Sequence, residues 1–559
     1  MAKAITNSFK LALAQLNPVV GDIAGNLAKA REARARAGEA GADLIVFTEL
    51  YLTGYPIEDL VLKPALQKAA REACEEFAGD TGNRGPAVLV GLPWGDGPFV
   101  YNAVALLDRG RIEAVRYKNN LPNYGVFDEK RVFAAGPMPE PIDFRGLKLG
   151  VPICEDIWSE EVCEVLADAG AKLLIVPNGS HYWIDKQEVR YGVAETRVAE
   201  TRLSLAYINQ VGGQDELVFD GASFVLNEDA ALAVQMPAWE EAVGVTEWHC
   251  ENGRWRCFPG LIAEIEEGDA ANYLACVTGL RDYVDKNGFP GVVLGLSGGV
   301  DSALCAVMAV DALGADHVRC VMLPYSYTSN KSLNDAAATA EALGVRYDIL
   351  PIHNAVDGLT EDLAKIFAGT SADATEENLQ SRARGTLLMA ISNKFGPIVI
   401  TTGNKSEVSV GYATLYGDMN GGFNPIKDLY KTQVYALAGY RNTQRPKGCL
   451  GPTGIVIPAN VLTKEPSAEL KANQRDQDTL PPYDVLDDIL NCLVELEMPL
   501  PEIIARGHPP ELVKKVERML YLAEYKRRQA APGVKITAKN FGRDRRYPIT
   551  NKFREKLSP

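Results

Sequence analysis

The sequence predicts an α/β protein with two large domains, and three observations lead to this prediction. Short apolar segments alternate with longer amphipathic segments along almost the whole chain, which is typical of layered α/β folds. The chain has 559 residues, which is too long for one ordinary hydrophobic core. Hydrophobic residues make up 47% and charged residues 23% of the chain, values that allow each domain to bury a sizeable core.

The first domain is predicted over residues 1–248. Residues 9–18 form a predicted strand, residues 26–42 an amphipathic helix and residues 43–50 a second strand. The sequence becomes polar and irregular after these α/β units, so residues 249–271 are predicted to be a linker. Further apolar strands of this domain are predicted at residues 87–93, 100–108, 111–118, 147–156, 172–180 and 205–213.

The second domain is predicted over residues 272–559. It begins with a helix at residues 272–288, which leads into an apolar strand and a glycine-rich turn at residues 292–302. Another alternation of strands and helices follows, so this domain is also predicted to be α/β. We find no internal repeat and no low-complexity segment in the sequence.

Charge and hydropathy disfavour several classes of partner. Lys and Arg number 58 against 73 Asp and Glu, and the net charge of −15 disfavours nonspecific binding to nucleic acid. No apolar run approaches the ~20 residues of a membrane span, and the N-terminal stretch lacks the apolar core of a signal peptide. We therefore expect a cytoplasmic protein with no nucleic-acid or membrane partner, which binds small molecules or protein.

One of the ten cysteines, Cys154, is a candidate nucleophile. No CxxC pair occurs, so most cysteines are expected to be small buried side chains. A predicted strand ends at Cys154 and a helix begins near Ser159, and nucleophiles are commonly displayed at such strand-to-helix turns. By residue type alone a buried core position is the commoner alternative.

The base for this thiol is better sought among acidic residues than among histidines. Only five histidines occur, and just His181 and His249 lie in the first domain or next to it. Glu49 lies at the end of the predicted strand 43–50, and Lys118 ends the predicted strand 111–118. A carboxylate, an ammonium and the Cys154 thiol thus fall at carboxyl ends of strands, where ligands gather in open α/β sheets.

These three residues, in this order, resemble the reactive set of the nitrilase superfamily. The resemblance covers residues 9–243 and implies an α-β-β-α sandwich that hydrolyses amides or nitriles. It implies that Glu49 takes the thiol proton, that Cys154 attacks the carbonyl carbon to form a thioester, and that Lys118 stabilises the oxyanion. A nearby ammonium is expected to lower the thiol pKa and to stabilise the developing negative charge. Glu129, in "FDEKRVF", resembles a second glutamate found near such sites.

Two further segments of the first domain indicate the substrate. The stretches "KNNLPNYGVFDEKRVF" and "PNGSHYWIDK" resemble those of glutaminase domains in which a tyrosine, a serine and a lysine hold glutamine. The resemblance implies that Tyr124, Ser180 and Lys186 bind glutamine. For each residue a plain core or surface role is the alternative.

The second domain carries a phosphate-binding pattern in "LGLSGGVDSALCAV", residues 294–307. An apolar strand, a tight turn and an amphipathic helix follow one another, so backbone amides and the helix dipole face any anion in the turn. No Gly-Lys-Ser/Thr follows the glycines, which excludes a Walker A loop. Asp301 would repel phosphates unless a cation intervened, and Mg²⁺ bound by a carboxylate and phosphate oxygens meets that need. An ordinary glycine-rich turn is the alternative.

This loop resembles the SGGxDS loop of N-type ATP pyrophosphatases, which cleave ATP between the α and β phosphates. The resemblance implies a doubly wound parallel sheet of the adenine nucleotide alpha hydrolase type. It also implies ATP contacts by the loop residues, which are Gly295, Leu296, Ser297, Gly298, Gly299, Val300, Asp301 and Ser302.

Segments 377–434, 458–470 and 523–549 narrow the resemblance to NAD synthetases. With a glutaminase domain in front, the chain resembles the glutamine-dependent branch of that family over nearly its full length. The resemblance implies that ATP adenylates deamido-NAD, the nicotinic acid dinucleotide, and that ammonia from glutamine attacks the adenylate. The products are then NAD, AMP, pyrophosphate and glutamate.

The same resemblance implies residues for each ligand of the second domain. Leu415 and Gly422 stand where some single-domain synthetases carry a lysine and an aspartate for the substrate, so those two contacts are not expected. The implied residues are, for Mg²⁺, Asp301 and Glu407; for ATP, Thr402, Lys431 and Thr463; and for deamido-NAD, Asn378, Arg382, Glu407 and Lys526.

The basic stretch at residues 526–556 reverses the acidity of the rest of the chain. Charge alone leaves a solvated tail, a subunit contact and a phosphate-binding role open. The resemblance gives a task only to Lys526.

Two sites in one chain also imply transfer of ammonia between them. We expect a channel between the domains and a homo-oligomer. Two alternatives stay open at this point: another glutamine-dependent ATP pyrophosphatase, such as a GMP or asparagine synthetase, and a noncatalytic nucleotide-binding regulator.

Overall fold

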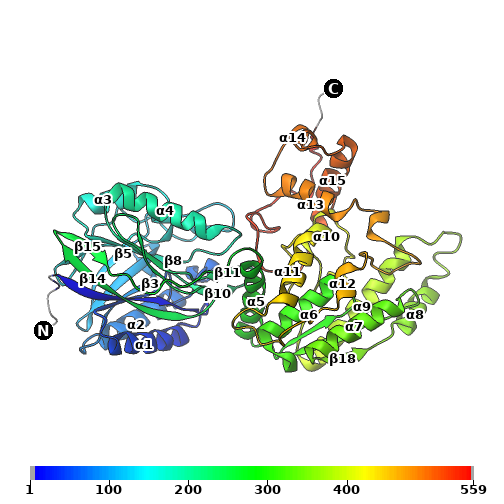
Figure 1. Ribbon diagram of the computed structural model, residues 1–559, viewed down its shortest axis with the longest axis horizontal. Helices are drawn as coiled ribbons and strands as arrows, with labels where there is room; N and C mark the ends of the chain where they lie inside the picture. The colour runs from blue at the N-terminus through cyan, green and yellow to red at the C-terminus, as the bar shows by residue number, and fades with distance from the viewer. Residues whose placement is uncertain (1–4, 6, 556–559) are drawn as a thin grey trace. The chain divides into compact units, whose positions relative to one another are not determined.

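The computed structural model describes residue 5 and residues 7–555, and it divides into two compact units at Glu266 (Figure 1). Lys556, the last residue of the predicted basic stretch, lies outside the described residues. Among the residues that the structure describes, no helix is long and apolar enough to cross a membrane.

The first unit is built on two large sheets. A seven-stranded sheet has the order β15-β14-β1-β2-β3-β4-β5, and a six-stranded sheet has the order β13-β12-β9-β8-β7-β6. The strands of the first sheet are β1 (Ser8–Gln15), β2 (Leu44–Val46), β3 (Ala87–Asp96), β4 (Phe99–Asp108), β5 (Arg111–Tyr117), β14 (Ala242–Glu251) and β15 (Arg254–Cys257). Those of the second are β6 (Ile142–Phe144), β7 (Leu147–Gly150), β8 (Leu173–Asn178), β9 (Leu205–Asn209), β12 (Phe224–Leu226) and β13 (Leu232–Gln235). A separate hairpin joins β10 (Val211–Gln214) to β11 (Leu217–Asp220).

The strand β1 shows why both faces of these sheets are buried. Side chains of a strand alternate between its two faces, and β1 carries apolar residues on both. Leu11 and Leu13 pack into the core between the sheets, which also contains Leu149. Ala12 and Ala14 face a second core with the helices α1 (Ile23–Glu39) and α2 (Pro64–Asp80).

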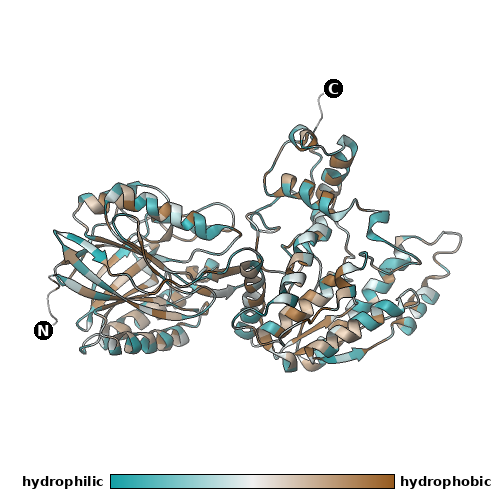
Figure 2. Cartoon of the chain, in the orientation of Figure 1, coloured by the Kyte–Doolittle hydropathy of each residue, from teal (hydrophilic) through white to brown (hydrophobic). Residues whose placement is uncertain are grey.

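Helices cover the outer faces of both sheets. The helices α3 (Glu161–Asp168) and α4 (Lys186–Thr201) bury Val162 and Val198 against the second sheet. Figure 1 shows α1 and α2 on one side of the strands and α3 and α4 on the other, and Figure 2 shows hydrophobic residues concentrated along the strands between them. The predicted nitrilase-like α-β-β-α sandwich is confirmed.

The predicted linker differs from the structure in its first half. Residues 249–251 end β14, and Arg254–Cys257 form β15, the edge strand of the first sheet. Trp255 and Cys257 alternate with exposed or half-buried arginines, and both are buried in the core between the sheets. The first unit therefore continues to Glu266, and the helix α5 (Gly268–Lys286) opens the second unit.

The second unit contains a four-stranded parallel sheet in the order β18-β17-β16-β19. Val293 and Val399 of this sheet pack against Val356 and Leu388 of α8 and α9, while α6 and α7 contact other parts of the sheet. Its strands are β16 (Val292–Gly295), β17 (Val318–Met322), β18 (Arg346–Ile349) and β19 (Ile398–Ile400). The helices next to it are α6 (Val300–Leu313), α7 (Asn330–Leu343), α8 (His353–Leu363) and α9 (Ala374–Phe395), and α11 (Lys431–Thr443) packs against α5 and α6.

The strand order creates a switch point between β16 and β19. From β16 the chain adds β17 and then β18 on one side, and it later returns to add β19 on the other. Ligands of open parallel sheets bind beyond the carboxyl ends of strands at such a point. The glycine-rich turn follows β16 directly, so it lies where the fold class places a ligand.

A cluster of short helices follows the sheet, and the sequence analysis did not predict it as a separate part. Leu486, Ile503 and Val516 are among the residues that form its apolar core. Its helices are α10 (Lys405–Val410), α13 (Tyr483–Val494), α14 (Leu500–Ala505), α15 (Pro510–Leu522) and α16 (Glu524–Arg527), and α12 (Ala459–Thr463) lies between α11 and α13 in the sequence.

Candidate active sites

The three residues predicted for the thiol site come together in the first unit. Glu49 follows β2, Lys118 follows β5, and Cys154 opens the short helix η3 (Cys154–Ile157) after β7. The Lys118 Nζ lies 2.7 Å from Glu49 Oε1 and 2.9 Å from both carboxylate oxygens of Glu129. The side chains of Lys118 and Glu49 are 0% exposed, and both interact electrostatically with the Cys154 thiol. A thiol, an ammonium and two carboxylates thus form one solvent-excluded cluster.

The turn at Cys154 is strained and is held by a buried carboxylate. Cys154 has φ +47°, in the left-handed region that residues other than glycine seldom adopt. Asp156 accepts hydrogen bonds from the backbone N–H groups of Ile153 (2.9 Å), Asn119 (3.1 Å) and Asn120 (2.7 Å). Asn119 and Asn120 directly follow the site lysine, so one carboxylate fixes the thiol turn against the segment that carries the ammonium.

The thiol pKa corrects one expectation from the sequence. Lys118 was expected to lower it, but burial, followed by the negative charge of Glu49, raises the pKa of the Cys154 thiol well above its ordinary value. Lys118 and a hydrogen bond from the Gly179 N–H oppose this rise without overcoming it. The resting side chain is therefore a protonated thiol, which would need a base in order to act as a nucleophile. Glu49 is the buried carboxylate that interacts electrostatically with it, and Glu49 accepts a hydrogen bond from the Gly179 N–H at 3.0 Å.

Glu129 is the second carboxylate of the cluster. It accepts hydrogen bonds from Lys118 and from the Tyr55 hydroxyl, the latter at 2.9 Å. Burial raises the pKa of Glu129 to about 7 in spite of the neighbouring ammonium. The pKa of Glu129 therefore lies close to neutral pH.

Two of the predicted glutamine-binding residues, Tyr124 and Lys186, lie near the thiol. Tyr124 contacts a carboxylate, and Lys186 is itself a cation. The Tyr124 hydroxyl donates to the Glu155 carboxylate at 2.9 Å, and Glu155 directly follows the nucleophile. The Lys186 Nζ lies 4.1 Å from the centre of the Trp158 ring and 5.1 Å from that of Trp183, and the part of the chain that the structure describes offers it no carboxylate partner. Burial, with a further contribution from a neighbouring arginine, lowers the pKa of Lys186 to about 7.

The third, Ser180, is fixed by a buried arginine. Arg190 donates from Nε to the Ser180 hydroxyl at 3.1 Å and from Nη2 to the Ser180 carbonyl at 2.7 Å. Asp220 pairs with Arg190 at 2.6 Å. The guanidinium therefore holds the serine and also places positive charge near Lys186.

Sequence reasoning missed Glu155, Asp156 and Arg190 in this site. Glu155 and Asp156 follow the candidate nucleophile in the sequence, and acidic side chains are common in the first turn of a helix, where they accept backbone N–H groups. That signal was available for Asp156. Arg190 lies one helical turn after Lys186, but its partner Asp220 is distant in sequence, so no local pattern indicates it.

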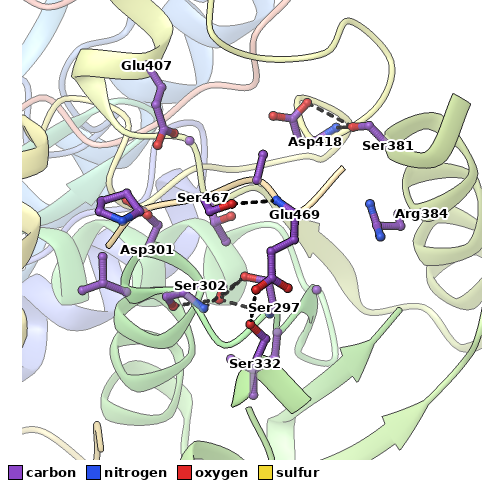
Figure 3. A pocket seen from close by; sticks show the side chains of 18 of the residues that line it. Ser297, Asp301, Ser302, Ser332, Ser381, Arg384, Glu407, Asp418, Ser467 and Glu469 are labelled. Carbon is purple, nitrogen blue, oxygen red and sulfur yellow. Dashed lines mark hydrogen bonds between the residues drawn. The ribbon is translucent and has the colours of Figure 1, made fainter. Parts of the chain in front are cut away.

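In the second unit, the predicted ATP-binding loop borders a cavity of about 300 Å³ at the switch point (Figure 3). The cavity is also lined by the segment after β19, by part of α9 and by residues 464–470. Predicted site residues that line it are Gly295, Leu296, Ser297, Gly299, Val300, Asp301, Ser302, Thr402, Glu407 and Lys431.

The conformation of this loop requires glycine at position 298. Gly298 has φ +80°, and a Cβ atom there would lie 2.3 Å from the Ser332 carbonyl oxygen. The Ser302 hydroxyl, at the start of α6, donates to the Gly299 carbonyl at 3.1 Å and accepts from the Ser297 N–H at 3.2 Å. The turn is thus closed on itself at the amino end of a helix, where an anion is stabilised.

Lys431 lies between two carboxylates at the edge of the cavity. Its Nζ pairs with Asp301, and it lies 3.3 Å from Glu407 Oε1. Asn404 donates to Asp301 at 2.8 Å and accepts from the Glu407 N–H at 3.0 Å. Burial raises the pKa of Glu407 to about 8, although Lys431 opposes the rise.

These two carboxylates fit a magnesium site. Asp301 and Glu407 both reach one cationic group, so their oxygens converge on a common region. Mg²⁺ in nucleotide sites is typically bound by one or two carboxylates, phosphate oxygens and water. Among the described residues no group of three or more His, Cys, Asp or Glu side chains gathers for a metal, so any metal here would need oxygens from a ligand.

Of the four residues predicted for deamido-NAD, Glu407 lines the cavity, and Asn378, Arg382 and Lys526 instead hold a neighbouring segment. Asn378 accepts from the Thr414 hydroxyl at 2.9 Å, and Arg382 donates to the Leu415 carbonyl at 3.2 Å. Lys526 donates to the carbonyls of Gly411 and Ala413 at 2.8 Å and 2.7 Å. All of them hold the segment 411–415, which supplies Thr414 to the cavity. None of Asn378, Arg382 and Lys526 is among the residues that line the cavity.

Two further predicted residues also lie outside the lining. Thr463 ends α12, and its hydroxyl donates to the Ala459 carbonyl at 3.3 Å. Its neighbour Lys464 does line the cavity. Gly298 turns toward Ser332 and also lies outside it.

The cavity contains charged residues that the sequence analysis did not single out. Arg384 donates from Nε to the Leu323 carbonyl at 2.9 Å, and burial lowers its pKa to about 10. Asp418 accepts from the Ser381 hydroxyl at 3.3 Å, and Glu469 accepts from that of Ser332 at 2.7 Å (Figure 3). Arg384 stands two residues after Arg382 on a helix, so helical periodicity could have indicated that the two arginines face different surroundings.

The two sites define a bifunctional class: a carbon-nitrogen hydrolase with a Glu-Lys-Cys cluster joined to a synthetase with an SGGxDS loop. The family model described as carbon-nitrogen hydrolase matches residues 10–253, and that described as NAD synthase matches residues 273–530. The glutamine-dependent NAD(+) synthetase of Rhodobacter capsulatus is 50% identical over 551 residues, covering 99% of this chain and 100% of the relative. That of Thermotoga maritima is 42% identical and covers 98% of this chain and 99% of the relative. The chain belongs to the glutamine-dependent NAD(+) synthetase family.

Solved structures agree with this assignment. The glutamine-dependent NAD+ synthetase from Acinetobacter baumannii, solved with adenosine diphosphate, has a TM-score of 0.77 and 44% identity. The comparison covers 97% of this chain and 99% of that chain. The enzyme from Cytophaga hutchinsonii has a TM-score of 0.80 at 21% identity, with coverages of 97% and 98%, and it supports the fold alone.

The Asp156 contacts generate a stability prediction. In Asp156→Asn an amide replaces the carboxylate, and its NH₂ group faces a backbone donor instead of accepting from it. We expect the free energy of unfolding of the first unit to fall by about 1–3 kcal/mol, because buried N–H groups lose an acceptor. Urea denaturation followed by tryptophan fluorescence measures this, since all six tryptophans lie in the first unit.

The matched control is Asp143→Asn, because Asp143 is exposed and accepts from the Gly146 N–H in a turn. It is expected to change the free energy of unfolding by less than about 0.5 kcal/mol. Equal effects of the two substitutions would contradict the role given to Asp156.

Proposed function

We propose that this chain converts deamido-NAD to NAD, with ATP as the activating substrate and glutamine as the nitrogen donor. The observation that carries the proposal is the presence of two chemically complete clusters in one chain, each with a lysine between two carboxylates. Full-length similarity to glutamine-dependent NAD(+) synthetases favours this function over another glutamine-dependent ATP pyrophosphatase. A noncatalytic regulator is disfavoured because both clusters keep their reactive side chains.

The substrate of the first site is proposed to be held by opposite charges. Lys186 binds the α-carboxylate of glutamine, and Glu155 binds its α-ammonium group. Tyr124 and Ser180 complete the contacts around the side chain. The geometry of an unpaired buried lysine and a carboxylate beside the nucleophile supports this orientation.

Hydrolysis then follows from the buried cluster. Glu49 takes the thiol proton as the Cys154 sulfur attacks the amide carbon, and Lys118 stabilises the oxyanion. The C–N bond breaks as Glu49 returns the proton to the leaving nitrogen, so ammonia departs and a thioester remains. Water, deprotonated by Glu49, attacks the thioester, and glutamate and the thiol are released.

The second site is proposed to activate the nicotinate carboxylate. A carboxylate oxygen attacks the α-phosphorus of ATP, the bond between the α-phosphorus and the bridging oxygen breaks, and pyrophosphate leaves. Ammonia then attacks the carbonyl carbon of the adenylate and expels AMP, which yields NAD. Loop amides of Ser297 to Ser302 and the amino end of α6 stabilise the departing pyrophosphate, and Lys431 neutralises part of its charge.

Asp301 and Glu407 would hold a Mg²⁺ ion, whose charge would screen the phosphates in this site. Asn378, Arg382 and Lys526 are proposed to contact deamido-NAD, either directly or through the segment 411–415 that they hold. Thr402 and Thr463 are proposed to contact ATP. The Acinetobacter baumannii enzyme was solved in complex with adenosine diphosphate, which supports a nucleotide site in this family.

Ammonia is proposed to pass from Cys154 to the adenylate through a channel, in a homo-oligomer. Free ammonia is protonated at neutral pH and ammonium is not a nucleophile, so an enclosed path preserves its reactivity.

Replacement of Cys154 tests the proposed division of labour. Cys154→Ala is expected to abolish NAD formation from glutamine and to retain NAD formation from ammonium chloride, because only the thioester step is lost. The control is Cys163→Ala, a buried cysteine of α3 in the core behind the second sheet, which is expected to keep both activities. Mass spectrometry of the dinucleotide product measures both.

The complementary variant is Asp301→Asn, which is expected to lose NAD formation with either nitrogen source. Loss of ammonium-driven synthesis in Cys154→Ala, or NAD formation by Asp301→Asn at the parent rate, would contradict the proposal.

The lowered pKa of Lys186 predicts a pH dependence of glutamine binding. Lysine is charged below its pKa, so its attraction for the glutamine carboxylate is present at low pH and is lost as pH rises through about 7. The KM for glutamine should therefore rise as pH increases past 7. Lys186→Arg keeps its charge throughout, so its KM should be much less dependent on pH over this range.

Measurement of KM for glutamine on both sides of pH 7, for both proteins, checks this. Identical pH profiles would contradict the role of Lys186 as the carboxylate ligand.

A further inference from the structure

The basic C-terminal segment is folded inward over the part that the structure describes. Arg527 is 7% exposed, Lys535 is 1% exposed and Arg545 is 5% exposed. Lys535 pairs with Asp544 at 2.6 Å, and Arg545 lies 3.6 Å from the centre of the Tyr547 ring. A solvated tail is therefore excluded at these positions, and the buried cations require partners.

Some of these partners belong to α10, the helix that carries Glu407. This helix has six residues. The first four N–H groups and the last four C=O groups of any helix lack partners inside it, so a helix this short depends on outside contacts at both ends. The position of Glu407 is therefore set by whatever holds the two ends of α10.

The carboxyl end of α10 is held by Arg527. Its Nη1 donates to the Ser409 carbonyl at 2.6 Å and to that of Val408 at 3.4 Å. Its Nη2 donates to the Leu520 carbonyl at 2.5 Å and to Glu524 at 2.8 Å. The planar guanidinium thus joins the last turn of α10 to the helices α15 and α16, an arrangement that a point charge such as lysine reproduces only in part.

The amino end of α10 is held by the same C-terminal segment. The buried Lys405 Nζ lies 2.5 Å from Glu495 and 2.8 Å from Asp428, and it donates to the Thr537 hydroxyl at 2.6 Å. Asp428 in turn accepts from the backbone N–H groups of Ile536 and Thr537 at 2.8 Å and 2.7 Å. Residues 527–537 therefore form hydrogen bonds with both ends of α10.

Between its two ends, α10 contributes Glu407 to the lining of the cavity. Asn404 joins the helix to Asp301, and the Ser406 hydroxyl accepts from the Lys431 N–H at 2.8 Å. A shift of α10 would therefore change the spacing of Glu407, Asp301 and Lys431 together.

We propose that Arg527 is a positioning residue for the magnesium-binding carboxylates, acting through the carboxyl end of α10. The proposal rests on the proposed function, in which Glu407 and Asp301 hold Mg²⁺. It gives the basic segment a task in addition to any contact that Lys526 makes with substrate.

The test is the magnesium dependence of the full chain. Arg527→Gln is expected to raise the Mg²⁺ concentration required for half-maximal ammonium-driven NAD synthesis by up to about 10-fold, the low end of the effect of removing a direct partner of a metal ligand, because Arg527 acts through the helix backbone. Calorimetric binding of ATP, titrated at several Mg²⁺ concentrations, should show the same shift without turnover. Arg527→Lys should recover part of the effect, since its ammonium retains some donors.

The matched control is Arg528→Gln. Arg528 is the next residue, and its guanidinium donates to Glu524 and to the Tyr547 carbonyl; among the described residues no hydrogen bond or ion pair joins it to α10. It is expected to keep the parent requirement for Mg²⁺. Its melting temperature and that of Arg527→Gln separate a loss of general stability from a loss of metal positioning.

An unchanged Mg²⁺ requirement in a folded Arg527→Gln protein would overturn the inference, as would an equal shift in Arg528→Gln. A parent enzyme whose ATP binding and synthesis do not depend on Mg²⁺ would instead overturn the metal assignment of the proposed function. The two failures are therefore distinguishable.

Discussion

A buried lysine held between two carboxylates recurs in both units, and the rest of each site depends on it. Lys118 contacts Glu49 and Glu129, and Lys431 contacts Asp301 and Glu407. An isolated buried ammonium costs several kcal/mol of desolvation, so it is tolerated only with close and correctly oriented partners. Each fold must therefore place three charged side chains close together. The strand ends and short helices around each lysine hold these side chains in place.

The two clusters differ in their access to ligands, and this difference suits their chemistry. The side chains of Lys118 and Glu49 are fully buried, so their mutual arrangement is fixed before substrate arrives, as electrostatic stabilisation of an oxyanion requires. Lys431 and its partners border the cavity. In the proposed function its ammonium would exchange carboxylates for phosphates when nucleotide and cation enter. The proposed function therefore assigns amide hydrolysis to the preorganised cluster and the release of pyrophosphate to the exchangeable one.

The sequence predicted that Glu49, Lys118 and Cys154 lie together because each falls at a strand end, where an apolar segment stops. The candidate residues of the second site, apart from the glycine-rich loop, came from family resemblance. Sequence reasoning did not anticipate the raised pKa of the Cys154 thiol, because burial and the approach of Glu49 arise only when distant strands pair. It placed Trp255 in a linker, since an edge strand of four residues is too short for its alternation to stand out. It gave the basic segment no task beyond Lys526, because the partners of Arg527 are carbonyl groups of a helix more than a hundred residues earlier. The local sequence pattern therefore indicates candidate reactive residues. Their pKa values and positions depend on contacts between residues far apart in the sequence.

In the proposed function, nitrogen released at Cys154 becomes the amide nitrogen of NAD made by the same protein. To test this, the protein is supplied with glutamine labelled with heavy nitrogen in its side-chain amide, together with ATP, deamido-NAD and unlabelled ammonium, and the mass of the NAD formed is determined. We expect NAD enriched in the heavy isotope well above its share of the total nitrogen supply. NAD that carries no label, or no NAD at all, would contradict the proposed function.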